Sequence, residues 1–236
     1  MTTALVLGGA GGIGAAVTRR LAADHDVTIT HHSHPERADA LVAELGDHVR
    51  AVAADATTEE GVIAAFDAAQ AQGELTVVVD CVGGWDYPRI TELTSEQIND
   101  SLSLNLVSAL LVLREATSRI ADGGRIVMVS SVAARVAPAR QSTYAAAKAG
   151  LEAASRVAAK EVAKRGVTVN VVRPGATDTE YLRSITSDKA IEAMAGSNAM
   201  RRLGTPEDIA GVIALLVSAD AAWITGDIID ATGGLA

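Results

Sequence analysis

The sequence predicts an α/β fold built on one doubly wound parallel sheet of about seven strands, with helices on both faces. Short, nearly continuous apolar runs alternate with longer segments of helical period along the 236 residues. Continuous apolar runs are typical of parallel strands that are buried on both faces. The first run leads directly into a glycine-rich turn at residues 8–14, and no linker, charge block or repeat interrupts the alternation. We therefore expect a single domain that spans residues 1–236.

The composition excludes several functional classes. Hydrophobic residues make up 49% of the chain and charged residues 21%, which is typical of a globular protein rather than a disordered one. A net charge of −9 argues against binding nucleic acid by bulk electrostatics, and the single cysteine, Cys81, fits a reducing compartment. The amino terminus lacks the features of a signal peptide, and no apolar run is long enough to cross a bilayer. We expect a cytoplasmic protein with neither a membrane nor a nucleic-acid partner.

Seven short apolar runs predict the strands of the sheet. Each has the length of a buried strand and is bounded by glycine, proline or polar residues. The predicted strands span residues 4–7, 27–30, 49–53, 75–79, 125–129, 167–172 and 228–230.

Segments of helical period connect these strands, and three of them begin with capping signals, in which a side-chain oxygen satisfies free backbone N–H groups. The signals are Thr57 with Glu60, Thr94 with Gln97, and Thr205 with Pro206 and Asp208. The helices run to residue 23, over residues 35–45, to residue 70, through Asn105, from Tyr144 to residue 165, and from residue 205 to residue 218. Residues 177–200 show no clear strand, and we expect them to form a lid over the carboxyl edge of the sheet.

Tyr144 and Lys148 lie four residues apart in an alanine-rich segment that should be helical, so their side chains share one helix face. A nearby cation favours the phenolate, and we expect Lys148 to lower the pKa of the Tyr144 phenol toward neutrality, as a general acid or base requires. Ser131 follows the apolar run at residues 126–129, which places its hydroxyl at the carboxyl edge of the sheet. Alternatively, the Tyr–Lys pair is a solvated helix face and Ser131 caps a turn.

The turn at residues 8–14 joins the first strand to a helix. Glycines permit positive φ and let a ligand approach the backbone closely. The following helix terminus offers free N–H groups and positive dipole character to a pyrophosphate. This order of strand, glycine turn and helix predicts a dinucleotide site, and the alternative is a glycine-rich turn without a ligand.

The end of the second strand bears on the choice of dinucleotide. An acidic residue here holds the ribose hydroxyls of NAD, whereas a 2′-phosphate prefers basic or hydroxyl partners. No Asp or Glu stands between Val27 and Pro35, and His32, Ser33 and Arg37 are candidate phosphate contacts. NADP(H) is therefore favoured, although acid-free loops do not forbid NAD(H). The histidines could instead bind a metal or be solvated, but no cluster of Cys or carboxylates accompanies them and we predict no metal site.

Taken together, the residues resemble the short-chain dehydrogenase/reductase family, which has the Rossmann fold, and among its members the 3-oxoacyl-acyl-carrier-protein reductases. The resemblance covers essentially the whole chain. Gly8, Gly12 and Gly14 match the family's cofactor loop, with Leu7 where threonine is usual. Residues 202–210 and 225–226 match its carboxyl-terminal signatures. The catalytic set is matched in order and spacing by Asn105, Ser131, Tyr144 and Lys148.

The resemblance implies hydride transfer between a nicotinamide cofactor and a carbonyl or secondary alcohol. Tyr144 would be the general acid or base, Ser131 would bind the substrate oxygen, and Lys148 would bind the ribose hydroxyls. Asn105 would hold a water that links Lys148 to solvent. The implied cofactor contacts are Gly8, Gly11, Gly12, Ile13, Gly14, His32, Ser33, Asp55, Ala56, Cys81, Val82, Gly83, Tyr144, Lys148, Pro174, Gly175, Thr177 and Thr179. Candidates for the substrate pocket, which could equally be packing residues, are Trp85, Tyr87, Val132, Val136 and Tyr181.

Two features depart from the family pattern. Asp80-Cys81-Val82-Gly83 stands where the family has Asn-Asn-Ala-Gly, and a carboxylate there must be hydrogen-bonded or protonated. Carrier-protein reductases often have a basic residue shortly before the fifth strand to meet an acidic carrier, whereas this chain has Ala121-Asp122-Gly123-Gly124. The second departure weakens the case for a carrier-bound substrate.

We expect an NADP(H)-dependent oxidoreductase of small carbonyl or alcohol substrates, with 3-oxoacyl thioesters among the candidates. The alternative enzyme is an NAD-dependent dehydrogenase of a small secondary alcohol or sugar. A non-catalytic dinucleotide-sensing protein is a minor alternative, because such a protein should have lost the set of Ser131, Tyr144 and Lys148. The resemblance also implies a homotetramer, for which the Asn105 and Tyr144 helices could supply the interface.

Overall fold

The computed structural model describes residues 2–85 and 87–235, and in these residues the central sheet has seven strands, all parallel. They are β1 (Thr2–Leu7), β2 (His25–His31), β3 (Val49–Ala53), β4 (Leu75–Asp80), β5 (Arg125–Val129), β6 (Thr168–Pro174) and β7 (Ile228–Ala231). The spatial order is β3-β2-β1-β4-β5-β6-β7. The chain therefore starts at the middle of the sheet, and the winding direction reverses between β1 and β4, where open α/β sheets bind their ligands.

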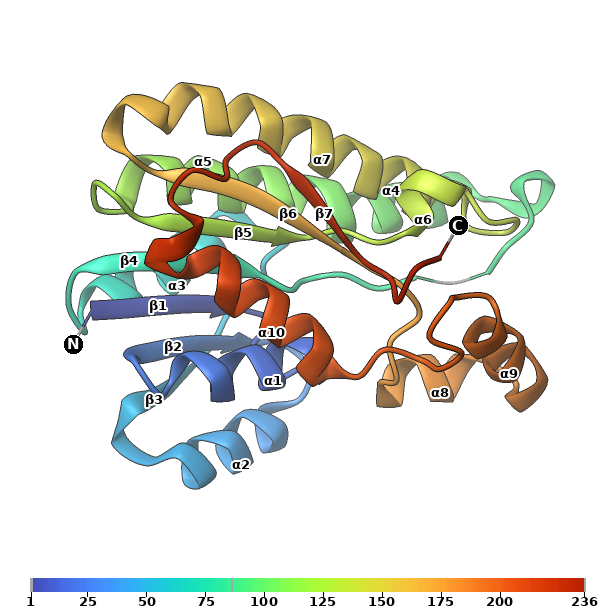
Figure 1. Cartoon of the computed structure of the whole chain (residues 1–236), viewed down its shortest axis with the longest axis horizontal. Helices are drawn as coiled ribbons and strands as arrows, with labels where there is room; N and C mark the ends of the chain where they lie inside the picture. Colours follow the sequence, from blue (N-terminus) through green and yellow to red (C-terminus); the bar gives the residue numbers. More distant parts are fainter. Residues whose placement is uncertain (1, 86, 236) are drawn as a thin grey trace.

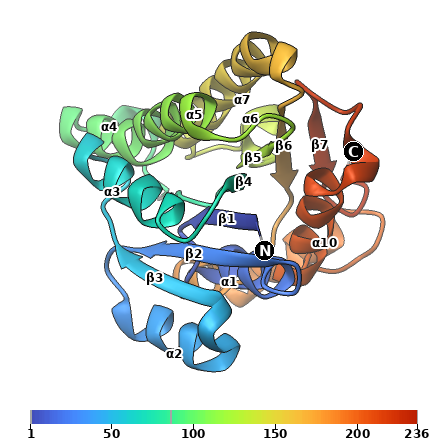
Figure 2. The ribbon, with the colours of Figure 1, turned by 90° about the vertical axis from the view of Figure 1, so that its left-hand side faces the viewer.

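Helices cover both faces of the sheet (Figures 1 and 2). One face packs against α1 (Gly12–Leu21), α2 (Pro35–Leu45) and α10 (Pro206–Val217). The other packs against α3 (Glu59–Gln70), α5 (Ser108–Arg119) and α7 (Ser142–Val162). Successive residues of β1 point to opposite faces of the sheet. Val6 packs in the core under α1, α2 and α10, and Leu5 and Leu7 pack in the core under α3, α5 and α7. The strands are consequently apolar on both faces, which explains their continuous apolar sequence.

All seven predicted strands are present, and their ends agree with the prediction to within two residues. The capping boxes at Thr94 and Thr205 are also confirmed. The box predicted at Thr57 is wrong, because the N-cap of α3 is Thr58, whose hydroxyl accepts from Gly61 N at 3.1 Å. The Thr57 hydroxyl instead donates to Asp55 Oδ1 at 2.7 Å. Two adjacent threonines are equivalent as sequence signals, and the local turn decides which one caps the helix.

The long helix expected around Asn105 is divided into three parts. It consists of α4 (Ser95–Leu102), a π-helical turn η3 (Ser103–Val107) and α5. A π-helical turn inserts one extra residue into an α-helix and is frequent at functional sites. Asn105 lies at the centre of this turn and is buried, although its position in the periodic pattern is unremarkable.

Residues 177–200 form a small lobe beyond the carboxyl ends of the strands, seen in orange and brown at the right of Figure 1. The lobe contains α8 (Glu180–Ile185) and α9 (Asp188–Gly196). Backbone bonds tie its two ends to the body, from Asp178 N to Gly204 O and from Met200 N to Gly233 O. The lobe lies beyond the carboxyl ends of the strands, and its role as a lid stays a prediction.

Short elements complete the fold: η1 (Gly46–His48), η2 (Ile90–Glu92), α6 (Ala133–Val136), η4 (Ala163–Arg165) and η5 (Ala219–Ala221). In the part of the chain that the structure describes, every helix is too short or too polar to cross a membrane.

Candidate active site

The glycine turn and the start of α1 form one wall of a site at the carboxyl edge of the sheet. Gly8 adopts a φ of 67°, and the first turn of α1 contains no acidic residue and no side-chain cap. Its backbone N–H groups and positive dipole end are therefore available to an anion. A Cβ on Gly14 would lie 2.1 Å from Gly8 O, so only glycine permits this tight turn.

The segments predicted to contact a cofactor converge on this wall. A Cβ on Gly8 would lie 3.3 Å from the carbonyl of Cys81, and one on Gly12 would lie 2.7 Å from the Thr179 methyl group. Thr177 Oγ1 donates to Gly175 O at 3.0 Å, within the segment that directly follows β6. These contacts bring together residues that are far apart in sequence, and the donor set around the glycine turn fits a dinucleotide pyrophosphate.

The predicted phosphate contacts lie after β2, with His32 and Ser33 in the loop and Arg37 in the first turn of α2. The His32 ring and the Ser33 hydroxyl are hydrogen-bonded to each other at 3.2 Å and are exposed. The Arg37 guanidinium pairs with Glu180 of α8 at 2.9 Å. Asp55, predicted beside the adenine ring, accepts two hydrogen bonds from Thr57, which lower the pKa of its carboxyl group. The His32 imidazole lies 3.8 Å from this carboxylate.

Lys148 is buried and donates to two backbone carbonyls, Val82 O at 3.1 Å and Val129 O at 3.0 Å. The Asn105 amide accepts from Gly84 N at 3.1 Å and donates to Gly84 O at 2.9 Å. Gly83 packs closely against both side chains. A Cβ added at this position would lie 2.9 Å from Asn105 Oδ1 and 3.0 Å from Lys148 Nζ, so there is no room for a larger residue. The π-helical turn thus holds the loop that follows β4 against the lysine.

Tyr144 lies one helical turn before Lys148 on the buried side of α7, in a small cluster with Ala133 and Trp85. Burial raises the pKa of the Tyr144 phenol to about 12, while its hydrogen bond with Ser131 acts in the opposite direction. The expected lowering by Lys148 is therefore wrong, because desolvation of the phenolate is the largest effect on this pKa and Lys148 is not among the groups that shift it. At neutral pH the phenol retains its proton and can donate it.

Aromatic side chains close the space around this phenol. The Trp85 ring lies 5.6 Å from the Tyr144 ring and 4.9 Å from the Tyr181 ring, measured between centroids. Trp85 N donates to the Tyr181 hydroxyl at 3.2 Å, and Trp85 Nε1 donates to the Tyr87 hydroxyl at 2.9 Å. Three of the predicted pocket residues, Trp85, Tyr87 and Tyr181, therefore lie together, and α8 supplies one of them. Val132, at the start of α6, and Val136, 44% exposed, show no contact with this cluster among those the structure describes.

Comparison with known proteins agrees with this geometry. A family model described as enoyl-(acyl carrier protein) reductase matches residues 8–236. An uncharacterised oxidoreductase from Methylorubrum extorquens is 36% identical over 98% of this chain and 96% of its own length. The 3-oxoacyl-(acyl-carrier-protein) reductase MabA from Mycobacterium avium is 34% identical over 98% of this chain and 88% of its own.

The chain belongs to the short-chain dehydrogenase/reductase family. It is an oxidoreductase that acts on CH–OH or carbonyl groups with NAD(P). A short-chain dehydrogenase/reductase from Serratia marcescens superposes with a TM-score of 0.93 at 31% identity, covering 99% of this chain and 97% of the other. A blue fluorescent protein from a metagenomic library, solved in complex with NADPH, gives 0.93 at 33% identity, covering 100% and 98%.

One group of residues at the site of this short-chain dehydrogenase/reductase was missed by sequence reasoning. Glu152, buried one turn beyond Lys148, accepts from Arg173 Nη2 at 2.7 Å and from the Ser130 hydroxyl at 2.7 Å. Arg173 also donates to Asp230 of β7 at 2.8 Å. The only sequence signal was the spacing of Tyr144, Lys148 and Glu152, which places three ionisable groups on one helix face.

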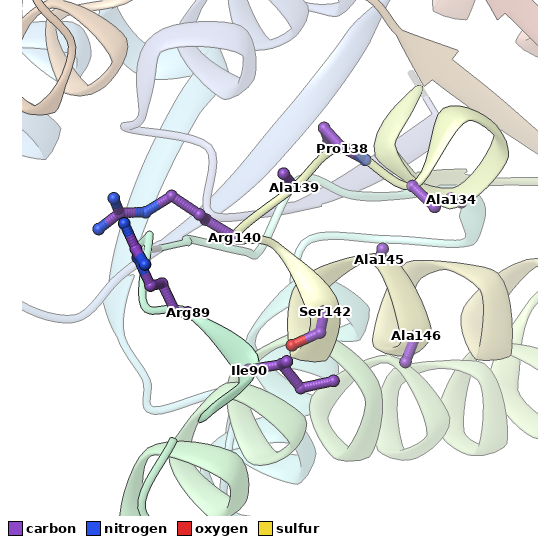
Figure 3. Close-up of a pocket in the computed structure, with 10 residues that line it drawn as sticks. Arg89, Ile90, Ala134, Pro138, Ala139, Arg140, Ser142, Ala145 and Ala146 are labelled. Atoms are coloured by element: carbon purple, nitrogen blue, oxygen red, sulfur yellow. The ribbon is translucent and has the colours of Figure 1, made fainter. Parts of the chain in front are cut away.

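A groove lies beside the first turn of α7, apart from the residues described above. It has a volume of about 830 Å³ and mostly apolar walls, and Figure 3 shows the guanidinium groups of Arg89 and Arg140 at one end of it. Arg140 Nε donates to Tyr87 O at 2.6 Å, and Arg89 lies 3.9 Å from Glu92. Of the described residues, neither Ser131 nor Tyr144 lines this groove, so it is separate from the candidate catalytic pair.

The raised pKa of Tyr144 can be tested by phenolate absorbance. The chain has three tyrosines, so the difference between the titrations of the wild type and Tyr144→Phe isolates this phenol. Because burial raises its pKa to about 12, we expect no phenolate from Tyr144 at the ordinary tyrosine pKa of about 10 while the protein stays folded. A midpoint below about pH 9 in the folded protein would show that a nearby cation governs the phenol after all.

Proposed function

We propose that this short-chain dehydrogenase/reductase is an NADP(H)-dependent oxidoreductase that transfers hydride between a nicotinamide and a carbonyl or secondary alcohol substrate. Support comes mainly from one observation: the buried Tyr144 phenol, whose pKa the Ser131 side chain lowers, lies one turn from a buried lysine at the edge that also bears the glycine turn. The substrate class to test first is a 3-oxoacyl thioester, since a relative is named as a 3-oxoacyl-(acyl-carrier-protein) reductase.

The nicotinamide ring would supply or accept the hydride. In carbonyl reduction Tyr144 would give its phenolic proton to the substrate oxygen, and Ser131 would hold that oxygen by a hydrogen bond. In alcohol oxidation Tyr144 would accept the proton, and this direction requires the phenolate. A raised pKa favours reduction at neutral pH, because the acid form of the phenol is then fully populated.

The remaining residues would position these groups. Lys148, fixed by Val82 O and Val129 O, would present its third N–H to the ribose hydroxyls. The Asn105 amide is occupied by the Gly84 backbone and by Ser101 O, so its part in holding water would fall to its main chain. The predicted contacts of the loop 81–83, Ala56, Pro174, Gly175, Thr177 and Thr179 would line the cofactor cleft.

Replacement of the phenol tests the chemistry. We expect Tyr144→Phe to lower the turnover of carbonyl reduction roughly 10²–10⁴-fold, the range for loss of a positioned acid, while the NADPH dissociation constant stays nearly unchanged. The measurement is NADPH absorbance with a panel of ketones, sugars and acyl thioesters, followed by a binding titration of the same variant. Turnover retained in Tyr144→Phe would remove this residue from the chemistry.

The preference for NADP(H) rests on the segment that follows β2, where His32 and Ser33 of the loop and Arg37 of α2 offer basic and hydroxyl groups. The solved structure of one similar protein contains NADPH. An NAD-linked dehydrogenase of a secondary alcohol or sugar is the second candidate, because Asp55 provides a carboxylate nearby and lies 3.8 Å from His32.

Paired titrations decide between the two cofactors. We expect the wild type to bind NADPH at least about tenfold more tightly than NADH, and Arg37→Ala to reduce this ratio without weakening NADH, since only the 2′-phosphate meets the guanidinium. Arg20→Ala, in the last turn of α1, is the control that removes an equal charge away from the site. A wild type that prefers NADH would overturn the assignment.

We also propose that the protein is a homotetramer that uses the outer faces of α5 and α7. Several large apolar side chains are exposed there and on the adjoining segment, namely Ile90 at 73%, Val107 at 43%, Leu110 at 45% and Val157 at 55%. An apolar surface of this kind is typical of subunit contacts.

Light scattering should give the mass of four chains for the wild type. Leu110→Glu should lower this mass, because it places a charge in the proposed contact. Ala40→Glu adds the same charge on α2, on the opposite side of the sheet, and should leave the mass unchanged. A monomeric wild type would contradict the proposal.

A further inference from the structure

A buried carboxylate lies at the end of β4, where the family pattern has an amide. Asp80 is 1% exposed, and its register partners on the flanking strands, Leu7 of β1 and Met128 of β5, are apolar and buried. A charge in such surroundings needs compensation. Burial raises the pKa of the Asp80 carboxyl group to about 6, while Lys148 and the Val82 N–H counteract that rise.

Asp80 and Lys148 are linked through the backbone of Val82, which lies between them. Val82 N donates to Asp80 Oδ1 at 3.0 Å, and Lys148 Nζ donates to Val82 O at 3.1 Å. The lysine is 3% exposed, and its other protein partner, Val129 O, is also a carbonyl. Carbonyl oxygens supply only partial charges, and burial lowers the pKa of Lys148. Among the groups that oppose this lowering, Asp80 has the largest effect.

The other described groups around this pair do not supply a negative charge. The Cys81 thiol is neutral, because burial raises its pKa, and so is the Tyr144 phenol on the preceding turn of α7. Glu152, on the following turn, is engaged by the Arg173 guanidinium through both of its oxygens. Asn105, on η3, is uncharged. Asp80 is thus the carboxylate available to Lys148 among the residues described.

We propose that Asp80 is a positioning residue that acts through Lys148: its carboxylate is the buried counter-charge that keeps the lysine ammonium protonated against Val82. This inference rests on the proposed function only for its effect on cofactor binding, because the proposed function has Lys148 bind the ribose hydroxyls of the cofactor. The pairing itself is a property of the protein. With an amide at position 80, the same lysine would lose its proton at a lower pH.

The direct test is an NMR titration of the lysine side chains, of which the chain has four, with the Lys148 signal assigned by its loss in Lys148→Met. Asp80→Asn preserves the shape of the side chain and the acceptor for Val82 N–H, and removes only the charge. We expect the Lys148 midpoint to fall by about one pH unit or more, a tenfold change in proton affinity. Asp220→Asn changes the net charge equally at an exposed site and should leave it unmoved.

If Asp80→Asn fails to fold, the titration of the wild type alone still tests the inference. The Lys148 signal should then show a second inflection near pH 6, where Asp80 takes up its proton. A Lys148 midpoint shared by the wild type and Asp80→Asn, or a wild-type titration without this inflection, would overturn the inference.

The consequence for the cofactor is measured separately. The alkaline limit of NADPH binding should move to lower pH in Asp80→Asn together with the Lys148 midpoint, whereas a purely structural defect would weaken binding equally at every pH. If the lysine midpoint moves but no carbonyl is reduced, the inference stands and the proposed function fails. If carbonyls are reduced but the Lys148 midpoint is the same in the wild type and Asp80→Asn, the proposed function stands and the inference fails.

Discussion

The buried ammonium of Lys148 is the interaction on which the geometry of the site depends. A cation taken out of water must be hydrogen-bonded, and the carbonyls that accept from it stand at the ends of β4 and β5. These strands are parallel neighbours, so both carbonyls lie at one edge of the sheet. The requirement therefore fixes the position of α7 against that edge, and with it Tyr144, one turn earlier on the same helix.

A second charged network, in which Glu152 is the buried member, holds the rest of the frame. Arg173 at the end of β6 binds Glu152 of α7 and Asp230 of β7, and Ser130 binds the same glutamate. Removing Arg173 would leave the buried Glu152 carboxylate without a cationic partner, which costs several kcal/mol. Ser131 directly follows Ser130. The hydrogen bond of Ser130 to Glu152 therefore also restrains the position of Ser131 relative to the Tyr144 phenol.

The parts predicted correctly from sequence are those governed by local pattern. Continuous apolar runs predicted the strands, and the spacing of Tyr144 and Lys148 predicted one shared helix face, which the structure shows to be buried. The pKa of Tyr144 was not predictable, because it depends on how Trp85, from another segment, removes water from the phenol. The pairs of Arg173 with Glu152 and Arg37 with Glu180 also join distant segments, and no single-sequence pattern specifies such partners.

Helix α8 shows why the substrate is harder to predict than the reaction. At its start the Thr179 methyl group packs against Gly12 of the glycine turn, and Glu180 binds Arg37 beside the proposed phosphate site. One residue later Tyr181 contacts Trp85, which covers the phenol. A helix of six residues thus lies next to both the proposed cofactor contacts and the proposed substrate contacts. Its sequence must satisfy both, so the choice of substrate is coupled to contacts that a pattern of spacing does not reveal.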